Sequence, residues 1–256
     1  MRRRFGHAEP VMGTVVSFDV SADDADELAV RAAVKVAVEW LHHVDAVFST
    51  YRPDSDISRL NDGELSLAAC SPLVGQVFEL CSDVARETRG YFSSTFAGRL
   101  DPTGLVKGWS VERASELLRD AGLPNHCVNG GGDVCARGGP DPGRGWSVAI
   151  THPLRRDGFA AVVEVRDGAV ATSGTTERGL HVVNPFTGRP ATQLASVTVV
   201  GPDLTRADAY ATAALAMGDA AREWFDEIAD YEALAIAPDG VGWATPGFTS
   251  IAALPT

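Results

Sequence analysis

Basic residues are scarce in this sequence of 256 residues, which carries 22 Lys and Arg against 34 Asp and Glu. The formal net charge is -12, whereas binding to a nucleic-acid backbone requires a surplus of Lys and Arg gathered on one face. We therefore expect no nucleic-acid partner. A small anionic ligand is still compatible with this balance, provided that a metal ion and backbone amides neutralise its charge locally.

Cysteine pairs and long apolar runs are also missing. The four cysteines, Cys70, Cys81, Cys127 and Cys135, form no C-x-x-C pair and no zinc-site spacing, so buried thiols in a reducing compartment are expected. No apolar run reaches the length of a membrane span. The N-terminal MRRRFGHAEPVMGTVVSFDV has an arginine cluster but not the apolar stretch of about 7 to 15 residues of a signal peptide. If the sequence is that of the whole gene product, we expect a cytoplasmic protein with no membrane span.

Helical spacing of apolar residues recurs along the chain, for example at Leu28, Leu41 and Val44. Residues that favour the start or the end of a helix mark the limits of other expected helices. Pro72 suits an early helical position, and Gly122 suits the end of a helix. The expected helices span residues 23–44, 72–88, 105–120, 207–217 and 220–231, and a polar loop spans residues 49–64.

Strand signals begin with VVSFDV and dominate the middle of the chain, where β-rich runs such as GWSVAITHP and SVTVVG are separated by Gly, Pro and Asp. EALAIAPDGVGWAT indicates a hairpin near the end. Helices and strands come in blocks instead of alternating, which favours an α+β fold over a doubly wound sheet. We expect one domain over residues 1–256, with a mixed or antiparallel sheet flanked by helices.

ADAYATAALAMG places Asp208 and Thr212 four residues apart, so a carboxylate and a hydroxyl project from one face of the expected helix. Magnesium prefers hard oxygen ligands and takes one or two protein carboxylates, with carbonyls, water and phosphate oxygens completing its shell. The same pair is common in helices that bind nothing, where the Asp favours the helix dipole and the Thr bonds back to the backbone. Spacing alone leaves both interpretations open.

Three loops suit polar or anionic ligands. NGGGDV, at residues 129–134, has glycines that permit positive φ and a close approach of backbone amides to a ligand. DPTGLVKGWSVERA, at residues 101–114, places Lys107 near a helix start, where amides and a lysine attract anions. TSGTTERG, at residues 172–179, is rich in hydroxyl groups. None matches a dinucleotide or P-loop fingerprint, and a tight turn, a capped helix and an ordinary loop are the alternatives.

His181 lies in GLHVVNPFTGRP, where an expected strand runs into a Pro and Gly turn, a position that can present an imidazole at the rim of a sheet. An imidazole that titrates near neutrality can accept a proton from a hydroxyl, although a lone histidine is more often structural. The sequence has no G-x-S-x-G motif, so no motif supports the interpretation as a Ser/His/Asp hydrolase.

Seven motifs, taken together and in order, resemble the ApbE family of FAD:protein FMN transferases over nearly the whole chain. They are VMGTVVSF, FSTYRPDSDISRLN, DPTGLVKGWSVERA, VNGGGDV, AVATSG, HVVNPFTGRP and ADAYATAALAMG. The resemblance implies a T-fold-like α+β domain that binds FAD in a cleft with magnesium on the pyrophosphate. It further implies transfer of FMN from FAD to a Thr or Ser hydroxyl of an acceptor flavoprotein, with release of AMP.

The resemblance also implies roles for single positions. Asp208 and Thr212 would be side-chain ligands of magnesium, and Gly104 would add its backbone carbonyl. His181 matches the histidine proposed as the base that activates the acceptor hydroxyl. The residues implied to line the FAD site are Met12, Tyr51, Tyr91, Phe92, Ser93, Asp101 and Lys107.

Two positions depart from the family pattern. Ser93 and Asn184 stand where family members often have Asp, so each position loses a carboxylate. Asn184 still accepts a hydrogen bond but gives His181 no charged partner. Many family members also carry an export signal, which is not visible here.

Two other functions stay open. A magnesium-dependent FAD pyrophosphatase would use water in place of the acceptor hydroxyl at the same metal site, yielding FMN and AMP. A non-catalytic FAD-binding protein would hold FAD intact, and Asp208 and Thr212 argue against it. No motif indicates the acceptor protein or the oligomeric state.

Overall fold

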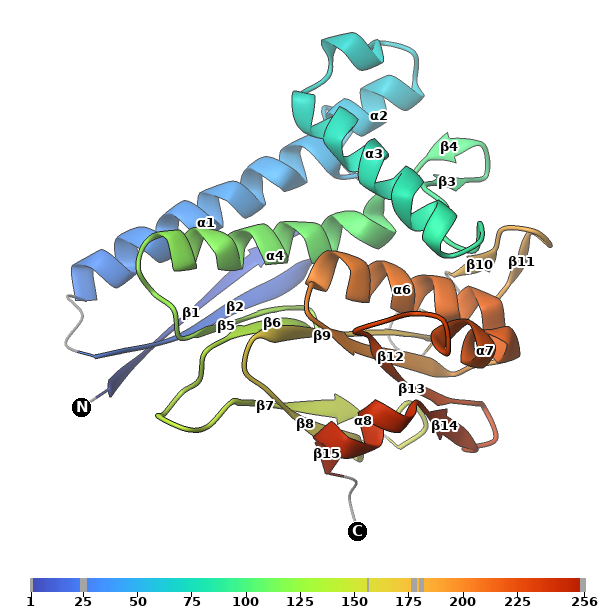
Figure 1. Ribbon diagram of the computed structural model, residues 1–256. Helices are drawn as coiled ribbons and strands as arrows, with labels where there is room; N and C mark the ends of the chain where they lie inside the picture. The colour runs from blue at the N-terminus through green and yellow to red at the C-terminus, as the bar shows by residue number, and fades with distance from the viewer. Residues whose placement is uncertain (1, 24–26, 156, 176–178, 180–181, 254–256) are drawn as a thin grey trace.

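The computed structural model describes residues 2–23, 27–155, 157–175, 179 and 182–253. In this part of the chain, an eight-stranded antiparallel sheet forms the central layer in the order β1-β2-β5-β6-β9-β12-β13-β14 (Figure 1). Its strands are β1 (Arg2–Val11), β2 (Thr14–Asp23), β5 (His126–Gly130), β6 (Asp133–Arg137), β9 (Gly168–Gly174), β12 (Ser196–Gly201), β13 (Glu232–Ile236) and β14 (Gly242–Ala244).

Helices cover one face of this sheet. The long helices α1 (Glu27–Phe48), α4 (Thr103–Asp120) and α6 (Leu204–Met217) lie side by side across it (Figure 1). Leu41 and Leu118 are fully buried between helices and sheet, in the larger of two apolar clusters. The other helices of the described residues are α2 (Asp56–Asn61), η1 (Leu67–Ala69), α3 (Pro72–Glu87), η2 (Gly218–Ala220), α7 (Ala221–Phe225) and α8 (Pro246–Ile251).

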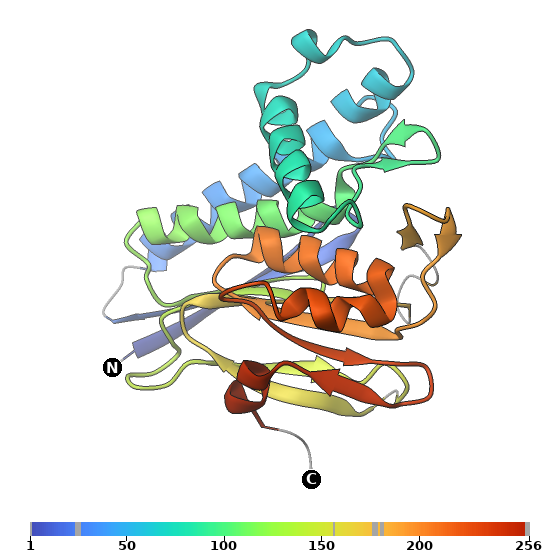
Figure 2. The same ribbon diagram turned by 45° about the vertical axis from the view of Figure 1, so that its right-hand side comes forward.

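A smaller sheet covers the opposite face, as Figure 2 shows. It consists of β15 (Ala252–Ala253), β8 (Phe159–Val165) and β7 (Trp146–Thr151), in that order. Along β7, Trp146, Val148 and Ile150 point inward and alternate with exposed residues. They pack with Phe248 of α8 into the second apolar cluster. The helical layer, the central sheet and the small sheet therefore form a three-layer α+β architecture, which confirms the predicted class.

Two short hairpins project from one side of the molecule (Figure 2). One pairs β3 (Thr95–Phe96) with β4 (Arg99–Leu100), and the other pairs β10 (Val183–Asn184) with β11 (Arg189–Pro190). Both hairpins contribute residues to the cavity described below.

Four of the five predicted helices are confirmed as α1, α3, α4 and α6, and the predicted late hairpin is β13 with β14. The helix predicted over residues 220–231 is confirmed in its first part as α7, but its extension to residue 231 is wrong, because α7 ends at Phe225 and Asp230 has a φ of 65°, which no right-handed helix accommodates. The loop predicted over residues 49–64 is also wrong in part, since it contains α2, whose Ile57 is fully buried.

Within the described residues, no helix combines the length and the apolar character needed to cross a membrane. The cytoplasmic location stays a prediction.

Candidate functional site

A cavity of about 1970 Å³ lies where the beginning of α4 faces the middle of α6. Nine of the predicted site residues line it, namely Met12, Tyr51, Tyr91, Ser93, Asp101, Gly104, Lys107, Asp208 and Thr212. Phe92 lies behind the wall, buried, with its ring 3.4 Å from where a Cβ on residue 104 would lie. His181, the predicted base, falls outside the described residues.

Asp208 is the buried carboxylate of the cavity, with 3% of its surface exposed. Its Oδ2 accepts a hydrogen bond of 2.9 Å from the backbone N–H of Gly108, and its Oδ1 lies 3.6 Å from Lys107 Nζ. The pKa of Asp208 is raised to about 7, mainly because burial deprives the carboxylate of its hydration; Lys107 opposes this rise and Asp133 adds to it. A bound cation would favour the ionised carboxylate.

Thr212, one turn further along α6, brings a hydroxyl to the same wall. Its Oγ1 lies 3.1 Å from the hydroxyl of Ser173 on β9. A Cβ on residue 104 would stand 3.7 Å from Thr212 Cγ2, which places the Gly104 backbone directly beside this side chain. The structure thus brings the Gly104 backbone beside a carboxylate and a hydroxyl that lie more than 100 residues further along the sequence.

These groups fit magnesium. They are hard oxygen donors with a single carboxylate at their centre, and magnesium needs few protein carboxylates when phosphate and water complete its shell. Among the described residues, no cluster of three or more His, Cys, Asp or Glu side chains could hold a metal, which disfavours zinc and other metals that need such a cluster. Asp208 and Thr212 are therefore the side chains that would hold magnesium, next to the Gly104 backbone.

Lys107 is held by Asp133, a residue that the sequence analysis did not single out. Asp133 is 1% exposed, its Oδ1 accepts a 3.0 Å hydrogen bond from the backbone N–H of Thr172, and its Oδ2 accepts one from Lys107 Nζ. The sequence did contain a signal for this residue, since Asp133 begins the apolar run DVCA and a carboxylate buried with that run requires a polar partner. Lys107 lies between two carboxylates and presents its positive charge to the cavity.

The glycine-rich turn at residues 129–134 connects β5 and β6 and also lines the cavity. Gly131 and Gly132 both have positive φ, at 64° and 99°. The segment is thus the tight sheet turn that the sequence allowed, and it lines the cavity; the binding of a ligand there stays a prediction.

Gly108 allows α4 and α6 to approach each other closely. A Cβ at this position would lie 2.6 Å from the Leu204 carbonyl oxygen and 2.7 Å from Asp208 Cβ. No side chain fits there without moving one helix. Because Gly104 and Lys107 belong to α4 while Asp208 and Thr212 belong to α6, this contact sets the width of the cavity between the two helices.

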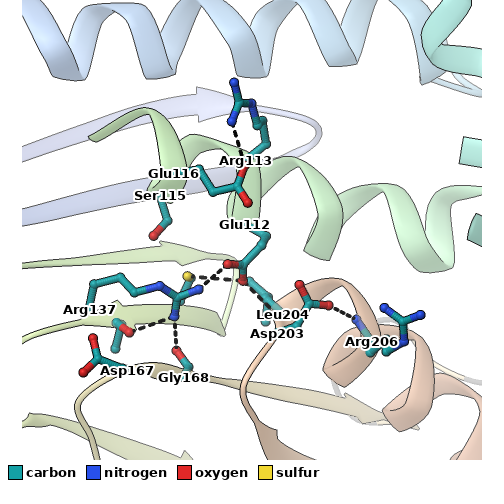
Figure 3. A network of polar contacts seen from close by, with 12 residues as sticks. Glu112, Arg113, Ser115, Glu116, Arg137, Asp167, Gly168, Asp203, Leu204 and Arg206 are labelled. Atoms are coloured by element: carbon teal, nitrogen blue, oxygen red, sulfur yellow. Dashed lines mark hydrogen bonds and ion pairs between the residues drawn. The ribbon is translucent and has the colours of Figure 1, made fainter. Parts of the chain in front are cut away.

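A second contact between the two helices is a buried ionic network, shown in Figure 3. Glu112 of α4 accepts hydrogen bonds from Arg137 of β6 and, at 2.9 Å, from the backbone N–H of Leu204, the first residue of α6. Arg137 also donates to the carbonyl oxygens of Ala136 and Gly168. The side chains of Glu112 and Arg137 are only 10% and 11% exposed. This network fixes the start of α6 against α4 and the sheet.

The remaining predicted residues form the rim. Met12 sits at the β1–β2 turn with a φ of 54°, and Tyr51 is 95% exposed on the loop after α1. Asp101 Oδ1 accepts hydrogen bonds from the backbone N–H and the hydroxyl of Thr103, at 3.1 and 2.6 Å, which stabilises the start of α4. Tyr91 packs edge-on against Phe186 of the β10–β11 turn, with ring centroids 4.9 Å apart.

The three-layer fold is shared by solved structures. The chain superposes on the flavin transferase ApbE from Vibrio cholerae with a TM-score of 0.81 at 23% identity, covering 98% of this chain and 100% of that one. It superposes on the ApbE protein from Thermotoga maritima with a TM-score of 0.86 at 20% identity, covering 97% and 99%.

The chain belongs to the ApbE family, whose family model matches residues 12–98 and 96–235. It is 29% identical over 165 residues to an FAD:protein FMN transferase of Klebsiella pneumoniae, covering 58% of this chain and 46% of that protein. It is 34% identical over 220 residues to one of Rhodobacter capsulatus, covering 81% and 38%. The match thus spans less than half the length of these two relatives.

Proposed function

We propose that this protein is an FAD:protein FMN transferase, which moves FMN from FAD to a Thr or Ser hydroxyl of an acceptor flavoprotein and releases AMP. The observation that carries the proposal is the convergence of Gly104, Lys107, Asp208 and Thr212 on one cavity. Family membership and the names of the relatives support it.

The cavity volume suits two reactants. Pockets for a single drug-sized ligand measure roughly 300 to 1,000 Å³, and this cavity measures about 1970 Å³. It therefore has room for FAD together with the acceptor segment that carries the hydroxyl. Tyr51 and Tyr91 at its rim offer aromatic surface to the flavin and adenine rings.

In the proposed reaction, the acceptor hydroxyl oxygen forms a bond to the phosphorus of the FMN half of FAD. The bond between that phosphorus and the bridging oxygen breaks, and AMP leaves with the bridging oxygen. Magnesium, when bound, neutralises charge on the pyrophosphate. Lys107 supplies a second positive charge beside the phosphates, and Asp133 keeps its ammonium group in place. His181 is proposed to take the hydroxyl proton.

The test follows AMP release from FAD by the purified protein, with and without magnesium and an acceptor flavoprotein. We expect release that requires both. Release at the same rate without acceptor would instead establish an FAD pyrophosphatase, and FAD binding with no release at all would establish a flavin-binding protein.

Asp208→Asn tests the metal site in the same assay. The amide keeps an oxygen that accepts from Gly108 but loses the charge, so we expect magnesium-dependent turnover to fall at least about 100-fold. Asp219→Ala, an exposed carboxylate just after α6, is the matched control and should retain turnover. Full activity in Asp208→Asn would exclude this carboxylate as a metal ligand.

A further inference from the structure

The β10–β11 hairpin forms one wall of the cavity. Val183, Pro185 and Gly188 line the cavity, as does Val182 just before β10. The base of the hairpin is fixed by a 2.9 Å hydrogen bond from the backbone N–H of Ala191 to the Val182 carbonyl oxygen. The position of its turn relative to α6 therefore decides how this wall faces Asp208 and Thr212.

Asn184 is the side chain that links this turn to α6. Its Oδ1 accepts hydrogen bonds from the backbone N–H groups of Phe186 and Thr187, at 3.0 and 3.2 Å. Its Nδ2 donates to the carbonyl oxygen of Ala216 at 3.1 Å. Among the described residues, no other hydrogen bond joins the hairpin to α6.

The orientation of the Asn184 amide is determined by its partners. Two N–H donors face one end of the group, so that end must be the oxygen, and the carbonyl of Ala216 faces the other, so that end must be the NH₂. If the amide were turned over, its NH₂ would face the two backbone N–H donors and its oxygen would face the Ala216 carbonyl oxygen. An aspartate could serve the turn but has no hydrogen to donate to Ala216.

The acceptor on α6 is a carbonyl that needs a partner from outside the helix. Ala216 lies in the last turn of α6, which ends at Met217, and the last four carbonyls of a helix have no intrahelical donor. Ala216 is 5% exposed, so water reaches it poorly. The Asn184 amide satisfies this carbonyl and simultaneously fixes the turn that carries Phe186, whose ring packs on Tyr91 at the cavity rim.

We propose that Asn184 is a positioning residue for the transfer reaction, which holds the β10–β11 wall in register with the helix that carries Asp208 and Thr212. This inference rests on the proposed function. It also explains why asparagine suits this chain at position 184, where a carboxylate would face a carbonyl oxygen.

The experiment compares Asn184→Asp with the wild-type protein. Asn184→Asp keeps the acceptor for the turn, removes the donor and sets a carboxylate against the Ala216 carbonyl. We expect kcat for FMN transfer to fall about tenfold, with KM for FAD changed less than about twofold, because a displaced wall misplaces the reacting groups. We also expect the backbone amides of residues 183–191 to exchange with deuterium about five- to tenfold faster.

Asn125→Asp is the matched control. The Asn125 side-chain oxygen accepts a 3.3 Å hydrogen bond from the backbone N–H of Gly139, and among the described residues its amide donates none. The same chemical change there breaks no hydrogen bond donated by the side chain, so kcat and exchange over residues 183–191 should stay at wild-type values.

Unchanged exchange in Asn184→Asp would overturn the link to α6, and faster exchange with unchanged kcat would overturn its role in the reaction. A wild-type protein without transferase activity would instead overturn the proposed function, and this inference with it. The exchange measurement would still show in that case whether the hydrogen bond to Ala216 holds the hairpin.

Discussion

Gly108→Ala should damage both the fold and the site, because it adds a methyl group where α4 and α6 touch. The new Cβ would lie 2.6 Å from the Leu204 carbonyl oxygen and 2.7 Å from Asp208 Cβ. Carbon atoms in good contact are about 3.5 to 4.0 Å apart, so the helices must separate by roughly 1 Å at this point. The 2.9 Å hydrogen bond from Gly108 to Asp208 Oδ2 would then stretch to a length at which it no longer holds.

Two magnitudes follow from this displacement. Overpacking of a tight core contact typically costs about 1 to 3 kcal/mol in the free energy of unfolding. A displacement of about 1 Å between catalytic groups can cost about 100-fold in rate, and here it separates Gly104 and Lys107 from Asp208 and Thr212. We therefore expect magnesium-dependent AMP release to fall about 100-fold in a protein that still folds.

The measurements are urea unfolding followed by circular dichroism and AMP release at saturating FAD. Gly75→Ala is the matched control, because Gly75 lies within α3 and a Cβ there meets no atom within 4 Å. This control should keep full activity and gain roughly 0.5 to 1 kcal/mol from the better helix propensity of alanine. If Gly108→Ala behaves like Gly75→Ala in both assays, the reasoning about the α4–α6 contact is refuted.

Further predictions concern buried polar groups away from the cavity. Glu112→Gln should lower the free energy of unfolding by about 3 kcal/mol in urea titrations, because Arg137 is left without its charged partner inside the protein. Glu116→Gln, which breaks the more exposed pair with Arg113, should cost at most about 0.5 kcal/mol, and equal losses would contradict this account. His126 is fully buried, and burial lowers its pKa from 6.5 to about 4, so the unfolded chain binds its proton first as the pH falls. The contribution of this histidine to the free energy of unfolding should therefore be fully present above pH 6.5 and should fall by about 3 kcal/mol toward pH 4. In urea titrations over the same pH range, a His126→Gln protein should lose less stability.

The sequence predicted the elements whose patterns are local and strong. The helices α1, α3 and α4 each bury one apolar face, α6 is buried along nearly its whole length, and β7 and β12 are β-rich runs between turn residues. β1 escaped prediction because most of it is exposed and it contains Gly6 and Pro10. Pairing with β2 makes it a strand, and a proline is tolerated there because β1 is an edge strand. The short helix α2 had a local signal that was missed, since Ser55 Oγ caps it by accepting from the Ser58 N–H.

In the candidate site, too, some residues could be predicted from the sequence and others could not. Helical spacing placed Asp208 and Thr212 on one face but left their role open, and the resemblance to the ApbE family then implied that both, together with Gly104, hold magnesium. Asp133 and Glu112 were missed, since their importance lies in partners far away in the chain, Lys107 and Arg137. The assignment of residues 1–256 to one domain and the role of His181 stay predictions.

The most direct test of the central claim is the intact mass of an acceptor flavoprotein after incubation with this protein, FAD and magnesium. The proposed function predicts that the acceptor gains the mass of one FMN, that one AMP appears for each adduct, and that a chelator prevents both. AMP without an adduct on any acceptor tested, or an adduct that forms equally well in the presence of the chelator, would contradict it.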